Sequence, residues 1–441
     1  MKRSWLCLTL ALLIPLGAIA RSPDSRPGVD APELARLGPF GVGFRTITLV
    51  QPRQVDLSAY DKAKGVAPLR DRVLPVDIWY PAKVSSGAKA MVYSGALPGE
   101  PPRGMIAFTV QGLAAPDAPA ARMHGGFPLI IVSHGYSGAP AAMTWLTENL
   151  ASKGYVVAAI HHNDPNISDG TQFAQPVLRR PLDIAFVVHT LQARAKAGDP
   201  VLADADPART ALIGYSMGGY GVLTVAGAGL SPQGFIGRAP PGGYFEPYMR
   251  GAAKAGDLGI EGLRAVVAIA PAGGGAGMNA WGAAGLADLR APLLVIGGDH
   301  DRTVGYADGL KTVFDQAIHA DRYLLVFQNG GHNLGMGSVP SQMQETLWDQ
   351  DWFEDPVWRK ARTNAIQQHM ITAFLDLYVK GDQTRADYLR TDVAISNAGK
   401  WPAGGGYAYA AISPGGAGAT WKGFARNHAL GLELHHEPAA P

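Results

Sequence analysis

The main candidate for a reactive residue in this sequence is a serine in a glycine-rich turn. Ser216 stands in the segment G-Y-S-M-G-G, after the apolar run 210–213 and before an apolar helical stretch. A chain that passes from a strand into a helix through one residue holds that residue in a strained conformation, and small residues two positions away allow the turn. The pattern predicts that the Ser216 hydroxyl is raised above a sheet as a nucleophile, at the positive end of the following helix.

Two later loops offer the base and the acid that such a serine needs. A serine hydroxyl is a weak nucleophile until a base accepts its proton, and an acid orients that base. His332 is the one histidine after the candidate acids that directly follows an apolar run, residues 323–327. Asp299 and Asp301 both follow the run 293–296. We favour Asp301 as the acid because it lies further into its loop, and Asp299 stays the alternative because it could instead hold the turn.

Two backbone amides are candidates for binding a negatively charged oxygen formed in such a reaction. The run 129–132 ends in S-H-G-Y-S-G, where a sheet of this type supplies one N–H group. The residue after the nucleophile supplies the other. We therefore predict an oxyanion hole made of the Tyr136 and Met217 N–H groups, with Gly135 allowing a close approach of the backbone. His134, in the same loop, is predicted to brace the turn rather than to act as a base.

Strands that must position these residues can be predicted from the hydrophobic pattern. Two early segments, 42–50 and 73–80, alternate between apolar and polar residues, which is typical of half-exposed antiparallel strands. From residue 128 onward, short apolar runs without alternation predict strands buried on both faces of a parallel sheet. These runs cover residues 129–132, 155–160, 210–213, 265–270, 293–296 and 323–327.

Helical stretches separate the runs. Residues 141–153 precede a glycine, and residues 181–195 have one apolar face. The last clear helix is predicted to begin with Asp355 as its cap and to end at Gly381. Alternating strands and helices behind two antiparallel strands predict an α/β fold, with a mostly parallel central sheet and helices on both faces.

The ends of the sequence differ in composition from its middle. Residues 1–20 combine a basic start, a short apolar core and small residues at the end, which predicts a cleavable secretory signal and export. Residues 21–37 are predicted to be a flexible leader, and residues 38–382 the α/β domain. A Gly/Pro/aromatic insertion at 228–262 could cover the pocket as a cap or be a surface elaboration. Residues 383–441 are a glycine-rich C-terminal extension.

Composition and charge exclude several kinds of function. Thirty-eight Lys and Arg against 36 Asp and Glu leave a net charge of +2, too little for a chain built to bind nucleic acid. The single cysteine, Cys7, cannot form an internal disulfide or a cysteine-rich zinc site. His161 and His162 lack further ligands at suitable spacing, so we predict no metal and no cofactor. After the start of the chain no segment offers about 18 uncharged apolar residues, so we predict no membrane anchor.

The motifs described above resemble those of serine hydrolases with the α/β-hydrolase fold. More narrowly, the sequence is similar to a bacterial group related to platelet-activating-factor acetylhydrolase and to predicted dienelactone hydrolases, over about residues 38 to 380. The matching segments include V-D-I-W-Y-P-A, V-S-H-G-Y-S-G, G-Y-S-M-G-G and A-D-R-Y-L-L-V-F-Q-N-G-G-H-N. The resemblance implies a nucleophile, an acid, a base and two oxyanion amides at Ser216, Asp301, His332, Tyr136 and Met217. True dienelactone hydrolases use a cysteine nucleophile, so their substrate is not implied.

The expected function is hydrolysis of small or short-acyl carboxylic esters by an exported, metal-independent serine esterase whose partner is a small-molecule ester. One alternative is a cutinase-like polyesterase, for which we expect an open cleft, whereas the 228–262 insertion favours a covered pocket. A prolyl-oligopeptidase-like peptidase and a non-catalytic binding module are further alternatives, and the binding module is the least favoured. Four aromatic residues near the site are predicted to pack rather than to stack on a ligand. They are Trp348, Trp352, Phe353 and Trp358.

Overall fold

A ten-stranded sheet forms the centre of the computed structural model, which describes residues 24–235, 239–275, 277–399, 421–425 and 427–441. Its strands lie in the order β12-β11-β10-β9-β8-β6-β7-β2-β1-β5. Their bounds are β1 Gly41–Val55, β2 Leu69–Ala82, β5 Ala115–Pro116, β6 Phe127–Ser133, β7 Val156–Ile160, β8 Ala205–Tyr215, β9 Leu263–Ile269, β10 Leu293–Gly298, β11 Arg322–Phe327 and β12 Leu432–Glu437. Two more strands, β3 (Val92–Pro98) and β4 (Met105–Gln111), form a separate hairpin that the sequence pattern did not predict.

The middle of the sheet is parallel and buried on both faces. Strands β6 to β11 run in one direction, whereas β2 is antiparallel to both β1 and β7. Successive side chains of a strand point to opposite faces. Accordingly, Leu129 and Ile131 of β6 lie in one apolar core, and Ile130 and Val132 lie in the other. The predicted α/β fold, with antiparallel leading strands and non-alternating buried strands, is confirmed.

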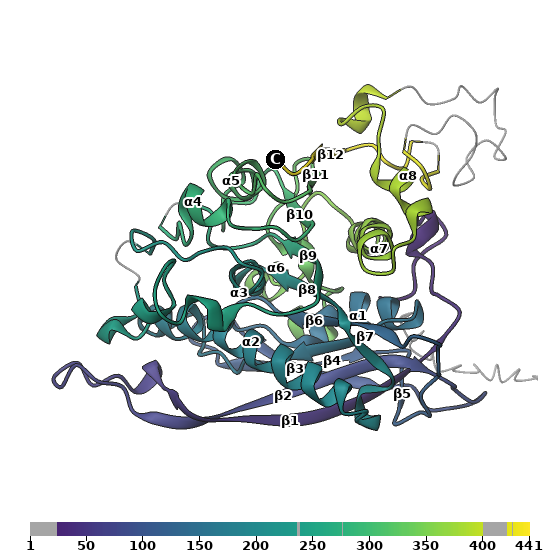
Figure 1. Cartoon of the computed structure of the whole chain (residues 1–441). Coiled ribbons are helices and arrows are strands. Elements are labelled where there is room, and N and C mark those ends of the chain that lie inside the picture. The colour runs from purple at the N-terminus through teal and green to yellow at the C-terminus, as the bar shows by residue number, and fades with distance from the viewer. Residues whose placement is uncertain (1–23, 236–238, 276, 400–420, 426) are drawn as a thin grey trace, which may run out of the picture.

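Helices cover both faces of this sheet, with α1 and α7 on one side and α2 to α5 on the other (Figure 1). In the described part of the chain, no helix is long and apolar enough to cross a membrane. The helices have these bounds: α1 Thr144–Ser152, α2 Ala174–Lys196, α3 Met217–Val225, α4 Gly282–Leu286, α5 Lys311–Gln316, α6 Leu347–Asp351, α7 Lys360–Tyr378 and α8 Ala386–Leu389.

Helix α2 begins earlier than predicted, so that Pro181 lies inside it. Proline has no N–H group, and the Val177 carbonyl therefore loses its donor within the helix. The Tyr220 hydroxyl of α3 donates to that carbonyl at 3.0 Å. The sequence pattern predicts a helix start at Pro181 because proline is common there. The helix extends further back because Tyr220, on another helix, supplies the missing donor.

Helix α7 begins later than predicted, at Lys360, and Asp355 is not its cap. Asp355 Oδ1 accepts hydrogen bonds from the N–H groups of Val357 and Trp358 at 2.9 and 2.7 Å, so it closes a separate turn. Asp355 Oδ2 accepts from the Gly331 N–H at 2.7 Å. The carboxylate thus joins this turn to the loop that follows β11, a tertiary contact that no local capping pattern reveals.

Residues 24–37 differ from the flexible leader that the sequence predicts. Ser25 Oγ donates to the buried Glu148 Oε2 at 2.6 Å, and the Ala35 side chain is fully buried. A segment rich in Pro, Asp and Arg has the composition of a mobile leader, but here its polar groups find partners on the domain. The predicted secretory signal, residues 1–20, lies outside the described residues.

The C-terminal extension contributes a strand to the sheet. β12 pairs antiparallel with β11 at the edge, and its Leu432 and Leu434 side chains are buried in the core on the α7 side. The glycine-rich stretch 402–419 lies outside the described residues. The last strand of the sheet therefore comes from a segment that the sequence placed outside the α/β domain.

Candidate active site

Ser216 occupies the sharp turn between β8 and α3. Its φ of 52° and ψ of −116° lie outside the regions that most residues adopt. The Ser216 N–H donates to the Ile269 carbonyl at 2.9 Å, and the Ser216 carbonyl accepts from the Ala272 N–H at 3.0 Å. An added Cβ at Gly214 or Gly218 would collide with nearby backbone. The glycines on either side of the serine are therefore required by the turn, as the motif predicts.

The structure brings Ser216, His332 and Asp301 together in one chain of hydrogen bonds. His332 Nε2 lies 3.0 Å from Ser216 Oγ, and His332 Nδ1 lies 2.7 Å from Asp301 Oδ2. Because a carboxylate only accepts, Nδ1 carries the ring proton, which leaves Nε2 of the neutral ring able to accept from the Ser216 hydroxyl. This arrangement can remove the serine proton while the carboxylate holds the ring in place.

The Asp301 carboxylate is buried and fully hydrogen-bonded. Its Oδ1 accepts from the N–H groups of Thr303 and Val304 at 2.9 and 3.0 Å. Burial by itself would raise the pKa of Asp301, but the bond with His332 and these two N–H groups together lower it below its ordinary value. Asp301 therefore stays ionised at neutral pH and can stabilise a positive charge on the imidazole.

Asp299, the alternative acid, bonds to other groups. Its Oδ1 lies 2.8 Å from His300 Nδ1 and accepts from the Asn329 N–H at 2.5 Å. The side chain thus links the loop after β10 to the loop after β11. This is the turn-holding role that the sequence left open for it.

The two predicted oxyanion amides lie at the ends of two neighbouring strands. Tyr136 belongs to the oxyanion loop (residues 133–138), which follows β6 and lines the same cavity as Ser216, and Met217 is the first residue of α3. Among the described residues, neither the Tyr136 N–H nor the Met217 N–H has a hydrogen-bond acceptor. A Cβ on Gly135 would lie 3.0 Å from the Tyr215 ring, so glycine permits the loop to approach β8. Unpaired N–H groups beside a nucleophile can stabilise a developing oxyanion.

A buried arginine holds the oxyanion loop in place. Arg180 of α2 donates to the His134 carbonyl and, at 2.9 Å, to the Gly135 carbonyl. It also pairs with Asp164, whose Oδ2 accepts from the Ser137 N–H at 3.1 Å. Arg180 therefore contacts the loop directly at the His134 and Gly135 carbonyls and, through Asp164, also holds the Ser137 N–H. Arg180 could not be recognised from the sequence, because a basic residue on a helix is usually solvated.

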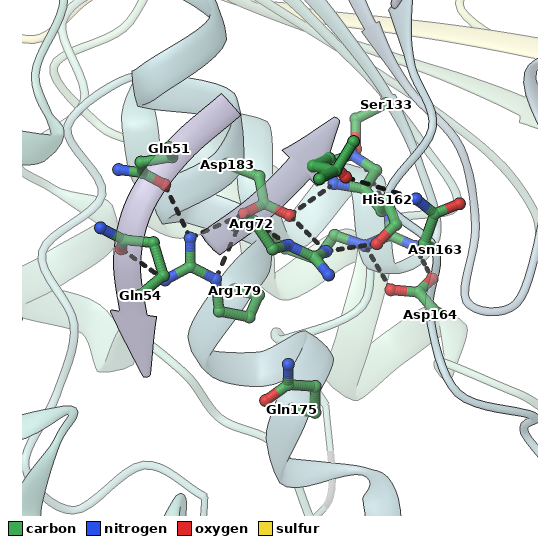
Figure 2. A network of polar contacts seen from close by, with 12 residues as sticks. Gln51, Gln54, Arg72, Ser133, His162, Asn163, Asp164, Gln175, Arg179 and Asp183 are labelled. Atoms are coloured by element: carbon green, nitrogen blue, oxygen red, sulfur yellow. Dashed lines mark hydrogen bonds and ion pairs between the residues drawn. The ribbon is translucent and has the colours of Figure 1, made fainter. Parts of the chain in front are cut away.

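A second set of charges connects α2 to the end of β6 (Figure 2). Asp183 is fully buried and pairs with Arg72 at 2.8 Å and with Arg179 at 2.9 Å. Its Oδ2 also lies 3.2 Å from His162 Nδ1. His162 Nε2 in turn lies 2.8 Å from the Ser133 hydroxyl, which donates to it. Through these contacts, the first residue of the oxyanion loop is tied to the helix that carries Arg180.

Two histidines near this network, His134 and His162, act as neutral braces. Burial first, and the charge of Arg180 second, lower the pKa of His162 to about 3 and hold the pKa of His134 well below its ordinary value. His134 Nδ1–H donates to the Gly135 carbonyl at 2.7 Å, in keeping with its predicted bracing role. His161 lies 2.8 Å from Asp77. Within the described ranges, no group of three or more His, Cys, Asp or Glu side chains is placed to hold a metal ion.

A cavity of about 410 Å³ contains Ser216 and His332 in its wall. Trp348 and Trp352 line this cavity. Phe353 and Trp358 are buried in the core on the α7 side and Trp352 packs against it, in keeping with the packing prediction for these three residues. The lining residues are Gly135, Tyr136, Gly138, Ile167, Ser168, Tyr215, Ser216, Thr303, His332, Asn333, Met336, Trp348, Asp351 and Trp352.

The insertion at 228–262 contributes none of its described residues to this cavity. Its Tyr244 hydroxyl instead accepts a hydrogen bond from the Ala67 N–H at 2.9 Å, and its Phe235 ring packs 6.0 Å from Tyr220. Of the two roles left open for this insertion, the contacts of its described part agree with a surface elaboration rather than a cap. Part of the cavity wall comes instead from α6 and the residue after it, in the long connection between β11 and α7.

Comparisons with known proteins match a part of the chain that contains Ser216. Residues 118–243 match a family model, PETase, described as PET hydrolase-like. "Cutinase est1" of Thermobifida alba is 34% identical over 106 residues, which is 24% of this chain and 32% of that protein. "Cutinase 1" of Thermobifida cellulosilytica is 32% identical over 105 residues, 24% of this chain and 36% of that protein. The chain thus spans about a third of the length of the curated relatives it matches.

The matched segment includes Tyr136, Arg180, Ser216 and Met217 but ends before the acid and the base. These relatives are cutinases, so they agree with the predicted esterase class and not specifically with the acetylhydrolase group. The chain has the α/β-hydrolase fold. The evidence is this match together with the mostly parallel sheet and the strand–turn–helix at Ser216.

Proposed function

We propose that this chain is a serine hydrolase that cleaves carboxylic esters, with Ser216, His332 and Asp301 as its catalytic residues. The observation that carries the proposal is the hydrogen-bonded series from Ser216 Oγ to His332 Nε2 at 3.0 Å and from His332 Nδ1 to Asp301 at 2.7 Å. The cavity beside Ser216 and the similarity to cutinases over the segment that contains it support the ester as substrate.

The geometry suits a two-step acyl transfer. Ser216 Oγ attacks the acyl carbon as its proton moves to His332 Nε2, and the Tyr136 and Met217 N–H groups bind the oxyanion. The tetrahedral intermediate then expels the alcohol, which takes the proton from His332 and leaves the acyl group on Ser216. Water attacks the acyl carbon, giving its proton to His332, and the free acid leaves as the serine regains its proton. Asp301 remains ionised and orients the imidazole throughout.

Replacement of the nucleophile tests this proposal. Ser216→Ala is expected to lower turnover of p-nitrophenyl acetate on the order of a million-fold. It should also abolish covalent labelling by a fluorophosphonate, while the exposed Ser341→Ala serves as a matched control with unchanged labelling. A Ser216→Ala protein that hydrolyses the ester near the wild-type rate would contradict the assignment, and so would a wild-type protein that the probe never labels.

Two ester classes fit the cavity, and the first is a small ester with a short acyl chain, as in the acetylhydrolase-like group that the motifs resemble. The second is a polyester, as for a cutinase-like enzyme. The similarity to cutinases and the open rim of the cavity favour this second candidate, because Leu347 and Trp348 are 73% and 41% exposed beside it. A series of p-nitrophenyl esters of increasing acyl length, compared with release of soluble products from a polyester film, separates the two.

We also propose that the enzyme acts outside the cytoplasm. The proposal rests on the secretory signal predicted for residues 1–20. Mass spectrometry of the secreted protein should find a new N-terminus near Arg21. Recovery of Met1 in the secreted form would overturn it.

A further inference from the structure

Helix α6 presents three residues to the cavity that contains Ser216. Trp348, Asp351 and Trp352 all line it. Their spacing of three and four residues places them on one face of a helix, and α6 continues into Trp352 with helical backbone angles. The cavity therefore has a wall that contains two indoles and a carboxylate from one face of α6, which we call the α6 wall.

The two indoles of the α6 wall are held by one acceptor. Trp348 Nε1–H and Trp352 Nε1–H both donate to the Pro98 carbonyl of β3, at 3.3 and 2.9 Å. Because this contact engages the N–H edge of each ring, the part of each indole that lines the cavity is apolar carbon. Such surfaces can attract a cation through the ring quadrupole but offer no hydrogen bond to a neutral polar group.

Contacts of other residues fix the position of α6. Asp349 is buried and pairs with Arg103 of the β3–β4 connection, and Arg103 also pairs with Glu345 at 2.7 Å. The Asn333 side chain, next to His332 in sequence, donates to the Asp351 carbonyl. The backbone that carries the α6 wall is thus tied both to the hairpin and to the loop of the catalytic base.

The Asp351 carboxylate, unlike those of Glu345 and Asp349, has no partner. In the part of the chain that the structure describes, it forms neither an ion pair nor a hydrogen bond, and only its backbone is engaged. Besides Asp351, His332 is the only Asp, Glu, Lys, Arg or His side chain among the described residues that line this cavity. The wall of the cavity therefore carries one carboxylate without a partner, on the same face of α6 as two aromatic rings.

We propose that the α6 wall binds a positively charged alkylammonium group on the substrate, an inference that rests on the proposed ester hydrolysis. A cation beside Asp351 gains Coulomb attraction, and its alkyl groups contact the indoles, which favour cations over neutral groups of equal size. The same carboxylate repels an ester that carries a negative charge. Among small esters of equal size, a cationic ester is thus preferred over a neutral one, and a neutral ester over an anionic one.

A pair of esters that differ only in charge tests the proposal. Acetylcholine and its neutral isostere 3,3-dimethylbutyl acetate have the same shape around the terminal group. We expect kcat/KM of the wild-type protein to be about tenfold higher for the cationic ester at low ionic strength, and the preference to shrink as salt is added. Asp351→Asn keeps the side-chain volume and should lower kcat/KM several-fold for acetylcholine only. Asp315→Asn, at a distant exposed ion pair with Lys311, is the matched control.

The outcomes separate this proposal from the proposed function. Equal kcat/KM values for the two esters in the wild-type protein, or an Asp351→Asn effect of the same size on both, would overturn the cation site. Hydrolysis of p-nitrophenyl acetate that depends on Ser216 would in that case leave the esterase proposal standing. Trp348→Leu gives a second measurement, because loss of one ring should reduce kcat/KM more for the cationic ester than for its isostere.

Discussion

The Asp299 and Asp301 carboxylates, one residue apart, form hydrogen bonds with different groups. Asp301 receives His332 Nδ1–H and two backbone N–H groups, whereas Asp299 receives His300 and the Asn329 N–H. An amide at position 301 can donate to Nδ1, which favours the ring tautomer whose Nε2 carries the proton. That tautomer cannot accept a proton from the serine.

Asp301→Asn is therefore expected to lower kcat about ten-thousand-fold. Asp299→Asn, the matched control, should change kcat by less than about tenfold, because the turn that it holds is not part of the proton pathway. Initial rates on p-nitrophenyl acetate, with circular dichroism to verify folding, measure both. Equal losses in the two variants would show that the acid has been misassigned.

The positions of Ser216, Asp301 and His332 could be predicted because each follows a strand of a parallel sheet. The carboxyl ends of such strands meet at one edge, so the order of the runs was enough to bring the three residues together. The position of Asp351 could not be predicted in this way. It lies in a long connection whose path depends on contacts with the β3–β4 hairpin, and that hairpin was itself missed.

At the scale of elements, α2 holds the loop to which we assign one of the two oxyanion amides. Arg180 contacts two successive carbonyls of the loop with one planar guanidinium, a geometry that a lysine ammonium cannot reproduce. Arg180→Lys keeps the charge beside Asp164 but loses this fork. We expect kcat to fall about ten- to hundredfold, with a smaller change in KM, because the loop binds the transition state more than the substrate.

Arg194→Lys provides the comparison for this variant, since Arg194 lies on the same helix and pairs with Asp199 away from the loop. Thermal melting of both proteins separates a loss of stability from a loss of catalysis. An Arg180→Lys protein with wild-type kcat would mean that the loop keeps its geometry without the arginine.

The buried ion pairs of Asp183 also predict how stability depends on pH. Burial would raise the pKa of Asp183, but the charges of Arg179 and Arg72 lower it well below its ordinary value. A carboxylate with a lowered pKa in the folded state stabilises the protein above its unfolded pKa, about 4. This contribution is lost as the pH falls from there toward the lowered pKa.

We therefore expect the free energy of unfolding of the wild-type protein to decrease below about pH 4. Asp183→Asn should be less stable at pH 7 by about 3 to 5 kcal/mol, because two buried arginines lose their partner, and its stability should depend less on pH in acid. Urea denaturation at several pH values between about 3 and 7 measures this. Parallel pH profiles for the two proteins would contradict the prediction.

At the scale of the whole molecule, both ends of the described chain are part of the fold. Residues 24–37 pack on the domain, and β12 completes the sheet. Composition predicts neither, because it reports the average polarity of a segment and not whether its polar groups find partners elsewhere. The central strands could be predicted because burial on both faces leaves a continuous apolar run in the sequence itself.

The edge strand β12 lies next to the strand that leads into the catalytic base. Leu434 is 3% exposed within the core on the α7 side, and the Gln328 N–H, just after β11, donates to the Gly431 carbonyl at 2.8 Å. Leu434→Ala should lower the free energy of unfolding by about 2 to 4 kcal/mol through the lost burial and the resulting cavity. Leu430→Ala, at a side chain that is 38% exposed just before the strand, should lower it by less than about 1 kcal/mol. Urea denaturation at neutral pH measures both, and equal values would mean that β12 adds no stability to the sheet that positions His332.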